Sequence, residues 1–217
     1  MTEVEAGATE WAVPGQVGVG PWEGPPPDDP RLDPELLAEG DRRNVVDAYR
    51  YWRRDAVVAD LAGRAHPFHV AIENFGHDHN IGTVVRTANA FAAAGVHIVG
   101  RRRWNRRGAM VTDRYQSLHH HEDAAALRDW AEEHGLPIVA VDNTAGAVRL
   151  EETTLPRECV LLFGQEGPGL TEVAREAAST LVSIAQFGST RSINAGVAAG
   201  IVMHAWVSRH ADLDSAW

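Results

Sequence analysis

The chain has 217 residues, of which 44% are hydrophobic and 23% are charged, and this length is enough for one well-filled core. No uncharged apolar run reaches about 18 residues, which excludes a helix that spans a membrane. The acidic start at residues 1–10 lacks the apolar stretch of a secretory signal. A single cysteine, Cys159, excludes a disulfide framework, so we expect a reducing compartment, the cytoplasm.

The net charge of -10 argues against binding to nucleic acid until its distribution is considered. Residues 1–40 carry nine acidic residues and one basic residue, whereas residues 41–217 carry 21 acidic and 19 basic residues. The negative charge therefore belongs mainly to the N-terminal segment, and the rest of the chain is nearly neutral. Every basic residue is arginine, which either a genomic bias or selection for bidentate phosphate contacts explains.

The N-terminal 64 residues differ in composition from the rest. Residues 1–32 contain six of the 11 prolines and no apolar periodicity, so we predict an acidic, mostly disordered tail whose Trp11 and Trp22 could dock locally. Asp33 followed by Pro34 is typical of a helix start. Residues 33–64 are therefore expected to form a helical extension, broken near Gly40. Its predicted apolar face comprises Tyr49, Trp52, Val57 and Leu61.

Residues 65–217 alternate between short apolar runs and longer amphipathic segments. The expected strands are 68–73, 96–99, 137–141, 159–163 and 181–184, and the expected helices are 81–94, 122–134, 170–178 and 192–209. This alternation predicts an α/β fold with a mainly parallel sheet flanked by helices. Ligand sites in such folds form beyond the carboxyl ends of the strands.

Three loops at those positions have unusual chemistry, namely 74–86, 164–169 and 186–194. In the first, Asn80 could cap the following helix, and Arg86 lies on a largely apolar helix where it either extends to solvent or needs a partner. In the second, three glycines allow close approach of a ligand, and Glu166 could accept hydrogen bonds from it. The same segment could instead be only a tight turn.

The third loop precedes a helix rich in small residues. Ser192 and Asn194 are natural helix caps, and this is their simplest role. Gly196 and Gly200 lie four residues apart, so one face of the helix is smooth enough for close packing.

Two groups of sequence features remain. The histidines of 77–79 and 119–121 lack the spacing of zinc ligands, so we expect no metal site. The segment 101–114 is strongly basic, and its tryptophan, Trp104, could stack on a base while the arginines bind phosphates. These arginines are Arg101, Arg102, Arg103, Arg106, Arg107 and Arg114. A solvated charged loop is the alternative. The helical extension carries further arginines, Arg42, Arg43, Arg50, Arg53 and Arg54.

Taken together, three motifs resemble the SpoU/TrmH family of RNA ribose 2′-O-methyltransferases, within the SPOUT class. They are Asn80-Ile81-Gly82 with Arg86-Thr87, the segment 162–170, and the segment 192–199. The resemblance implies a C-terminal trefoil knot, S-adenosylmethionine as cofactor, and a homodimer whose site uses residues of both subunits. It also implies an RNA substrate. Only a helix and a tail precede the motifs, which favours tRNA over rRNA.

The resemblance also assigns roles to residues. Arg86 would act beside the ribose hydroxyl, either as a cation or as a base deprotonated through an RNA phosphate. Asn80, Glu166, Ser192 and Asn194 would orient Arg86 and the nucleotide. The cofactor would lie on backbone groups of Val141, Gly164, Ile184 and Ile193, without a metal. Ile193 replaces the usual leucine, and Gly196 a common serine. A catalytically inactive knotted RNA-binding or assembly protein is the alternative, while a small-molecule enzyme lacks any nucleotide fingerprint.

Overall fold

The computed structural model describes residues 18–76 and 78–215. Its contacts divide the chain into two compact units, Met1–Val57 and Val58–Trp217. In the part of the chain that is described, no helix is both long and apolar enough to cross a membrane.

The N-terminal unit confirms the predicted helix start. Helix α1 (Pro34–Glu39) begins after Asp33, whose carboxylate accepts hydrogen bonds from the backbone N–H groups of the first turn, and it ends at Gly40, where φ is 90°. The chain that follows is not one continuous helix, because only the short turn η1 (Asp47–Tyr49) precedes α2 (Arg54–Arg64). Tyr49 and Val57 are buried, as expected of the apolar face.

Residues 18–32 make defined contacts, in contrast to the disordered tail that was predicted. Val19 pairs with Asp41, and Leu32 pairs with Trp52. Trp22 packs edge-on against the ring of Tyr51, with centroids 5.6 Å apart. Residues 1–17, including Trp11, lie outside the described residues. The predicted domain boundaries after residues 32 and 64 stay predictions, although the contacts divide the chain after Val57.

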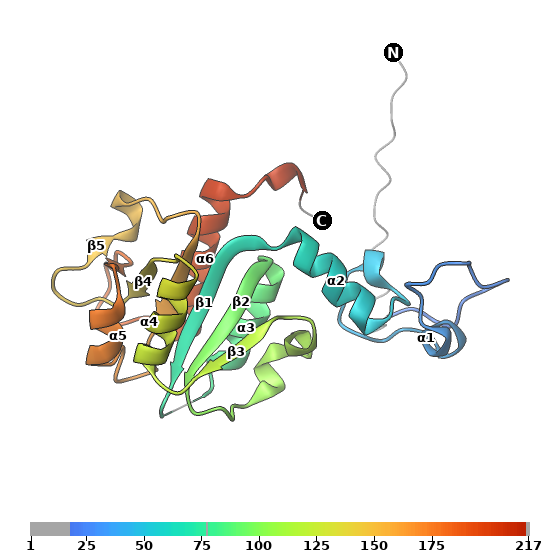
Figure 1. The fold of residues 1–217 in the computed structure, drawn as a ribbon, viewed down its shortest axis with the longest axis horizontal. Coiled ribbons are helices and arrows are strands. Elements are labelled where there is room, and N and C mark those ends of the chain that lie inside the picture. Colours follow the sequence, from blue (N-terminus) through green and yellow to red (C-terminus); the bar gives the residue numbers. More distant parts are fainter. Residues whose placement is uncertain (1–17, 77, 216–217) are drawn as a thin grey trace, which may run out of the picture. The chain divides into compact units, whose positions relative to one another are not determined.

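The second unit is built on a seven-stranded sheet in which all paired strands are parallel (Figure 1). Across the sheet the order is β3-β2-β1-β6-β4-β7-β5. The strands are β1 (His66–Asn74), β2 (Ala93–Gly100), β3 (Leu118–His121), β4 (Ile138–Val141), β5 (Val148–Arg149), β6 (Cys159–Phe163) and β7 (Thr180–Ser183). The predicted parallel sheet is therefore confirmed.

Helices cover both faces of this sheet (Figure 1). Because successive strand residues point to opposite faces, Val70 and Ile72 of β1 pack on one side and Ala71 on the other. The first side is closed by α3 (Ile81–Ala90) and α6 (Ala195–His210). The second is closed by α4 (Ala124–Glu133) and α5 (Glu172–Ala177).

Among the differences from the expected elements, three have a clear physical cause. Helix α3 ends four residues early, because Ala92 has φ of 50° and β2 already begins at Ala93. Strands β3 and β5 were not predicted, since β3 contains three successive histidines and β5 has only two residues. Neither sequence has the apolar pattern that identifies a buried strand.

The smooth face of α6 is used inside the chain. A Cβ atom on Gly196 would lie 3.3 Å from Cγ2 of Thr83, and one on Gly200 would lie 4.0 Å from Cγ2 of Thr87. Both threonines belong to α3, so the two glycines allow α3 and α6 to pack closely. This face is therefore not left open for a second subunit, as the sequence had allowed.

Candidate functional site

The three predicted loops meet at one edge of the sheet. They follow β1, β6 and β7, which end at Asn74, Phe163 and Ser183. Because these strands are parallel, their carboxyl ends lie on the same side, where ligand sites form in such folds. The sheet therefore brings together segments that are far apart in the chain.

Three polar side chains, one from each loop, form a hydrogen-bonded network. Asn80 Nδ2 donates to Glu166 Oε2 at 2.7 Å, and Asn194 Nδ2 donates to the same oxygen at 3.1 Å. Asn194 Nδ2 also lies 2.9 Å from Asn80 Oδ1, and the backbone N–H of Ala195 donates to Glu166 Oε2 at 3.2 Å. One carboxylate oxygen thus accepts three donors, while Oε1 of Glu166 has no hydrogen bond within residues 18–76 and 78–215. We call these three residues the site network.

The two asparagines differ in how they meet their helices. Asn194 caps α6, because its Oδ1 accepts hydrogen bonds from the N–H groups of Gly196 and Val197 at 3.0 and 3.2 Å. Asn80 precedes α3 but makes no capping hydrogen bond. The prediction of a cap is therefore wrong for Asn80, whose side chain is committed to Glu166 instead.

The two other predicted catalytic residues are placed differently. Ser192 lines the same cavity as Glu166, and its carbonyl oxygen accepts the hydroxyl of Thr190 at 2.8 Å. Arg86 is exposed on α3, and its side chain has no hydrogen bond or ion pair with any described residue. The single chain thus brings Asn80, Glu166 and Asn194 together but leaves Arg86 outside the network.

A cavity of about 450 Å³ lies beside the network. All four predicted cofactor residues line it, namely Val141, Gly164, Ile184 and Ile193. The described residues contain three buried side-chain atoms without a hydrogen-bond partner, on Thr144, Arg175 and Gln186, and all three residues line this cavity. Sequence reasoning did not name these residues as site residues, because none lies in a motif, although Gln186 begins the third loop.

The glycines of the second loop are required by its own packing. A Cβ atom on Gly164 would lie 2.3 Å from the carbonyl carbon of Gly169, a distance that no side chain tolerates. Gln165 and Gly169 exchange backbone hydrogen bonds, and Gly167 and Gly169 have φ of 92° and 73°. The loop is therefore both a tight turn and a wall of the cavity, so the two interpretations of its sequence do not exclude each other.

Two side chains brace this loop against β1. The buried carboxylate of Glu73 accepts hydrogen bonds from the N–H and the hydroxyl of Thr171, at 2.9 and 2.6 Å. Burial raises the pKa of Glu73, although these hydrogen bonds oppose the rise. Gln165 Oε1 accepts the N–H of Phe75 at 3.0 Å. The only sequence signal for this brace was an acidic residue at the end of an apolar strand.

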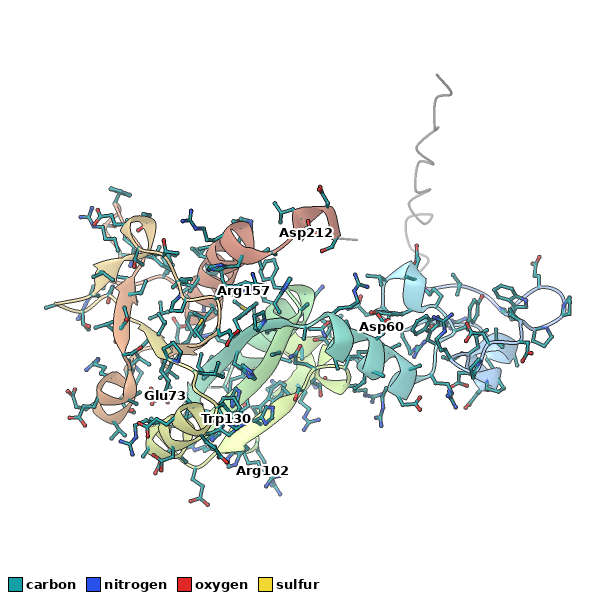
Figure 2. All side chains as sticks on the ribbon, turned by 45° about the horizontal axis from the view of Figure 1, so that its top comes forward. Asp60, Glu73, Arg102, Trp130, Arg157 and Asp212 are labelled. Atoms are coloured by element: carbon teal, nitrogen blue, oxygen red, sulfur yellow. The ribbon has the colours of Figure 1, made fainter. Side chains whose placement is uncertain are left out.

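The basic segment 101–114 between β2 and β3, which we call the arginine loop, is anchored beside the first motif. Asn74 Nδ2 donates to the carbonyl oxygens of Arg101 and Arg103, and Asp78 accepts the N–H of Asn105 at 2.7 Å. Arg102 extends away from the sheet (Figure 2). Trp104 is partly buried against the core, so the expectation that it stacks on a base does not agree with its position.

The cationic side chains of this loop are mostly unpaired. Arg106 forms an ion pair with Asp113 at 3.1 Å, and Arg101 donates to the carbonyl oxygen of Gly76 at 3.3 Å. The other predicted RNA-binding residues have no hydrogen bond or ion pair of their side chains to the described residues; they are Arg102, Arg103, Arg107 and Arg114. The loop thus presents several free guanidinium groups.

Three histidines, which we call the histidine chain, lie elsewhere, between β1–β3 and α4; they are His69, His97 and His121. His69 Nδ1 lies 3.0 Å from His97 Nε2, and His97 Nδ1 lies 2.8 Å from His121 Nε2. Each ring nitrogen of His97 is thus used by a different neighbour. No group of three or more ligand side chains suited to a metal ion occurs among the residues described. The buried thiol of Cys159 is also far from reactive, since burial raises its pKa to about 12.

Comparisons with known proteins agree with this arrangement. The model of the SpoU rRNA Methylase family matches residues 67–204. A curated protein of Mycobacterium avium, named an uncharacterized tRNA/rRNA methyltransferase, is 32% identical over 165 residues, which are 73% of this chain and 52% of the relative. The chain thus spans about half the length of the curated relatives it matches.

Two solved structures show the same fold. The TrmH/SpoU tRNA modifying enzyme of A. aeolicus is 20% identical, with a TM-score of 0.63 over 72% of this chain and 83% of that chain. An AdoMet-bound rRNA methyltransferase of Sinorhizobium meliloti is 28% identical, with a TM-score of 0.59 over 69% of this chain and 60% of that chain. The matched region contains all three motifs, and the chain therefore belongs to the SpoU rRNA methylase family.

Proposed function

We propose that this chain uses S-adenosylmethionine to methylate a ribose 2′-hydroxyl in structured RNA, with tRNA favoured over rRNA. The observation that carries the proposal is the site network, which stands beside a cavity lined by residues of the second and third loops. Family membership supports RNA methylation as the reaction. The ribose 2′-hydroxyl as the methylated group is our proposal.

The cavity fits the cofactor in size and in chemistry. Its volume of about 450 Å³ is within the range of sites for small organic ligands. Val141, Ile184 and Ile193 supply apolar contacts for an adenine ring. The unpartnered polar atoms of Thr144 and Gln186 supply hydrogen bonds to polar groups of the ligand. S-adenosylmethionine supplies a methyl group that is activated by its bond to a positively charged sulfur.

The residues of the chain orient and activate the RNA hydroxyl. Glu166 is held by Asn80 and Asn194 through one oxygen, so its second oxygen is free to accept a hydrogen bond from the nucleotide. A ribose hydroxyl is a poor nucleophile at neutral pH and needs a base or a nearby cation. Arg86 fills this role, as a cation beside the developing alkoxide or as a base whose proton leaves through an RNA phosphate. Rigid positioning by the network contributes the alignment.

We further propose that Arg86 serves the site of a second copy in a homodimer. The side chain lies outside the network of its own chain, although it is exposed on α3. On the neighbouring helix α6, Val197 and Ile201 are 54% and 39% exposed and share one helix face, which gives a dimer an apolar contact.

Mixing two inactive variants tests this arrangement. Arg86→Ala and Asn194→Ala are each expected to be inactive alone. After exchange of subunits, statistical mixing is expected to restore about a quarter of the wild-type activity if Arg86 acts across the interface. No recovery despite proven exchange of subunits would show that Arg86 acts within its own chain.

A knot and a cytoplasmic location complete the proposal. The segment after β4 holds the segment after β7, because Asn143 Nδ2 donates to the carbonyl of Arg191, and Glu151 accepts the N–H of Ala185. A trefoil knot formed by the second and third motifs is part of this proposal, and membership of the family supports it. The single, buried Cys159 is compatible with the reducing cytoplasm.

Methyl transfer from labelled S-adenosylmethionine to separated tRNA and rRNA tests the function. A methylated 2′-hydroxyl protects the adjacent phosphodiester from alkali, so the label is expected in alkali-resistant dinucleotides of tRNA. Arg86→Ala is expected to abolish transfer, whereas Arg128→Ala, an exposed arginine on α4, serves as the matched control. Label in alkali-sensitive positions would contradict the ribose assignment. RNA binding without any transfer would favour the inactive RNA-binding protein.

A further inference from the structure

A single aromatic ring stands fully in solvent beside the site. Phe187 is 97% exposed, more than any other large apolar side chain among the described residues, of which Leu213 follows at 64%. Water contact with a whole phenyl ring is unfavourable, and an exposed aromatic residue therefore calls for a partner. The ring lies in the segment 184–191, between β7 and the third motif.

The segment that carries Phe187 is anchored at both ends. At one end, the N–H of Ala185 donates to the carboxylate of Glu151 at 3.1 and 3.4 Å. At the other end, Asn143 Nδ2 donates to the carbonyl oxygen of Arg191. The exposed ring is therefore presented by a held loop and not by a free chain end.

The orientation of the loop separates Phe187 from the cofactor cavity. The neighbouring Gln186 lines that cavity and has a buried amide oxygen, whereas Phe187 does not line it. Phe187 instead borders a second cavity of about 280 Å³. The two cavities share lining residues, including Asn143, Gln186 and Arg191, so they adjoin each other.

Two arginines accompany the ring at the second cavity. Arg191 is exposed, and its guanidinium has no hydrogen bond or ion pair with the described part of the chain. Among the residues that the structure describes, Arg149 pairs with the similarly exposed Glu152, at 3.3 Å, and such a surface pair is easily exchanged for another anion. An exposed aromatic ring with cations alongside is the combination that binds unpaired nucleotides, since bases stack on the ring and phosphates pair with the arginines.

We propose that Phe187 is a stacking platform for an unpaired base of the RNA substrate, with Arg191 and Arg149 binding adjacent phosphates. This inference rests on the proposed function, because it assumes that RNA reaches the edge of the sheet where the cavity opens. It adds a second contact surface to that of the arginine loop. In the strand order β2, which precedes the arginine loop, lies towards one end of the sheet, and β7, which precedes Phe187, lies towards the other end.

Direct RNA binding by the full-length protein tests this role. The probes are unfractionated bacterial tRNA and, separately, bacterial rRNA, each titrated over a range of salt concentrations. Phe187→Ala is expected to weaken binding of one of them about tenfold without changing the salt slope, because stacking involves no counterion. Phe187→Trp is expected to restore affinity, and Phe187→Leu is not. Arg191→Ala is expected to lower the salt slope by about 1. Leu213→Ala is the matched control for loss of an exposed apolar side chain.

Three further measurements decide against other roles. Affinity for S-adenosylmethionine and the oligomeric state are expected to be the same in Phe187→Ala and in the wild type. A loss of cofactor affinity would assign Phe187 to the cofactor site, and a change in oligomeric state would assign it to a subunit interface. Either result overturns the proposal. Unchanged RNA affinity overturns it as well. Methyl transfer is measured in parallel, so that a wild-type protein that binds RNA through Phe187 but transfers no methyl group refutes the proposed function alone.

Discussion

The site network and the histidine chain are two groups of hydrogen-bonded polar side chains in the same unit. They differ in whether a hydrogen-bonding atom stays unused. Glu166 and Asn194 are exposed, Asn80 is half-buried, and the three residues leave one carboxylate oxygen of Glu166 unused beside a cavity. His69, His97 and His121 lie between the strands and α4, and both nitrogens of the central ring are occupied. Hydrogen-bonding capacity left open beside a cavity points to a ligand, whereas capacity satisfied within the core points to a structural role.

Trp130 covers the histidine chain and shields its rings from solvent. This α4 residue lies over the strands (Figure 2), with its ring centroid 4.2 Å from that of His97. Burial lowers the pKa of His97 to about 2 and that of His69 to about 4, so both rings are neutral in the folded protein at pH 7. Glu166, by contrast, is exposed and lines the cavity.

The largest expected effect is on activity. Glu166→Gln can keep a carbonyl oxygen where Oε2 accepts its three donors, but it removes the negative charge and puts an NH2 group in place of the free oxygen that is proposed to accept a hydrogen bond from the nucleotide. Methyl transfer is expected to fall at least about a hundredfold, as for other groups that hold a transition state, while the melting temperature changes little. Single-turnover assays and thermal melts measure both quantities. Glu172→Gln, on the exposed face of α5, is the control, and an equal loss there would remove the contrast.

The second prediction is the opposite: a loss of stability with little change in activity. His97→Ala leaves a cavity under Trp130 and removes a partner from both His69 and His121. The free energy of unfolding is expected to drop by about 2–4 kcal/mol. The activity of the folded protein is expected to stay close to that of the wild type. Urea denaturation of this variant and of the exposed control His204→Ala measures the effect; a stable but inactive variant would contradict the structural role.

The third prediction concerns pH. Because the pKa of His97 is lower in the folded protein than the value of 6.5 in the unfolded chain, the unfolded state binds more protons below pH 6.5. Stability is therefore fully present above pH 6.5 and is lost as the pH falls, by about 1.4 kcal/mol per pH unit for this one histidine. His69 adds to the slope down to about pH 4, and the raised pKa of Glu73 opposes it.

Urea midpoints measured between pH 7.5 and 4.5 test this slope. His97→Ala is expected to have a shallower dependence on pH than the wild type. Parallel curves for His97→Ala and the wild type would show that the histidine chain does not govern the acid sensitivity of the fold.

The smallest expected effect concerns the arginine loop. Arg102→Ala removes one unpaired cation and is expected to weaken RNA binding only a few-fold, while the salt slope falls by about 1. Titrations at several salt concentrations measure both, with Arg128→Ala as the control. An unchanged slope would show that this side chain does not contact a phosphate, so that the exposed loop would be only a solvated charged surface.

Much of the fold was predictable because its signals are local. The apolar run of β6 has the predicted bounds, Cys159–Phe163, and the pair Asp33-Pro34 starts a helix as expected. Strand β3 was missed because His120 and His121 find their hydrogen-bond partners on β2, at Gly100 and His97, and no local pattern records those partners. Packing of this kind overrides the weak preference of a short segment.

The sequence alone determined the motifs, the parallel α/β architecture and the capping role of Asn194, because each depends on residues close together in the chain. Tertiary structure decided that Asn80 bonds to Glu166 across 86 positions instead of capping α3, and that Gly196 packs on Thr83. It also decided that Arg86 stands apart from the site network while Phe187 stands in solvent. The physical reason is that the order of strands in the sheet, and not distance along the chain, sets which loops meet.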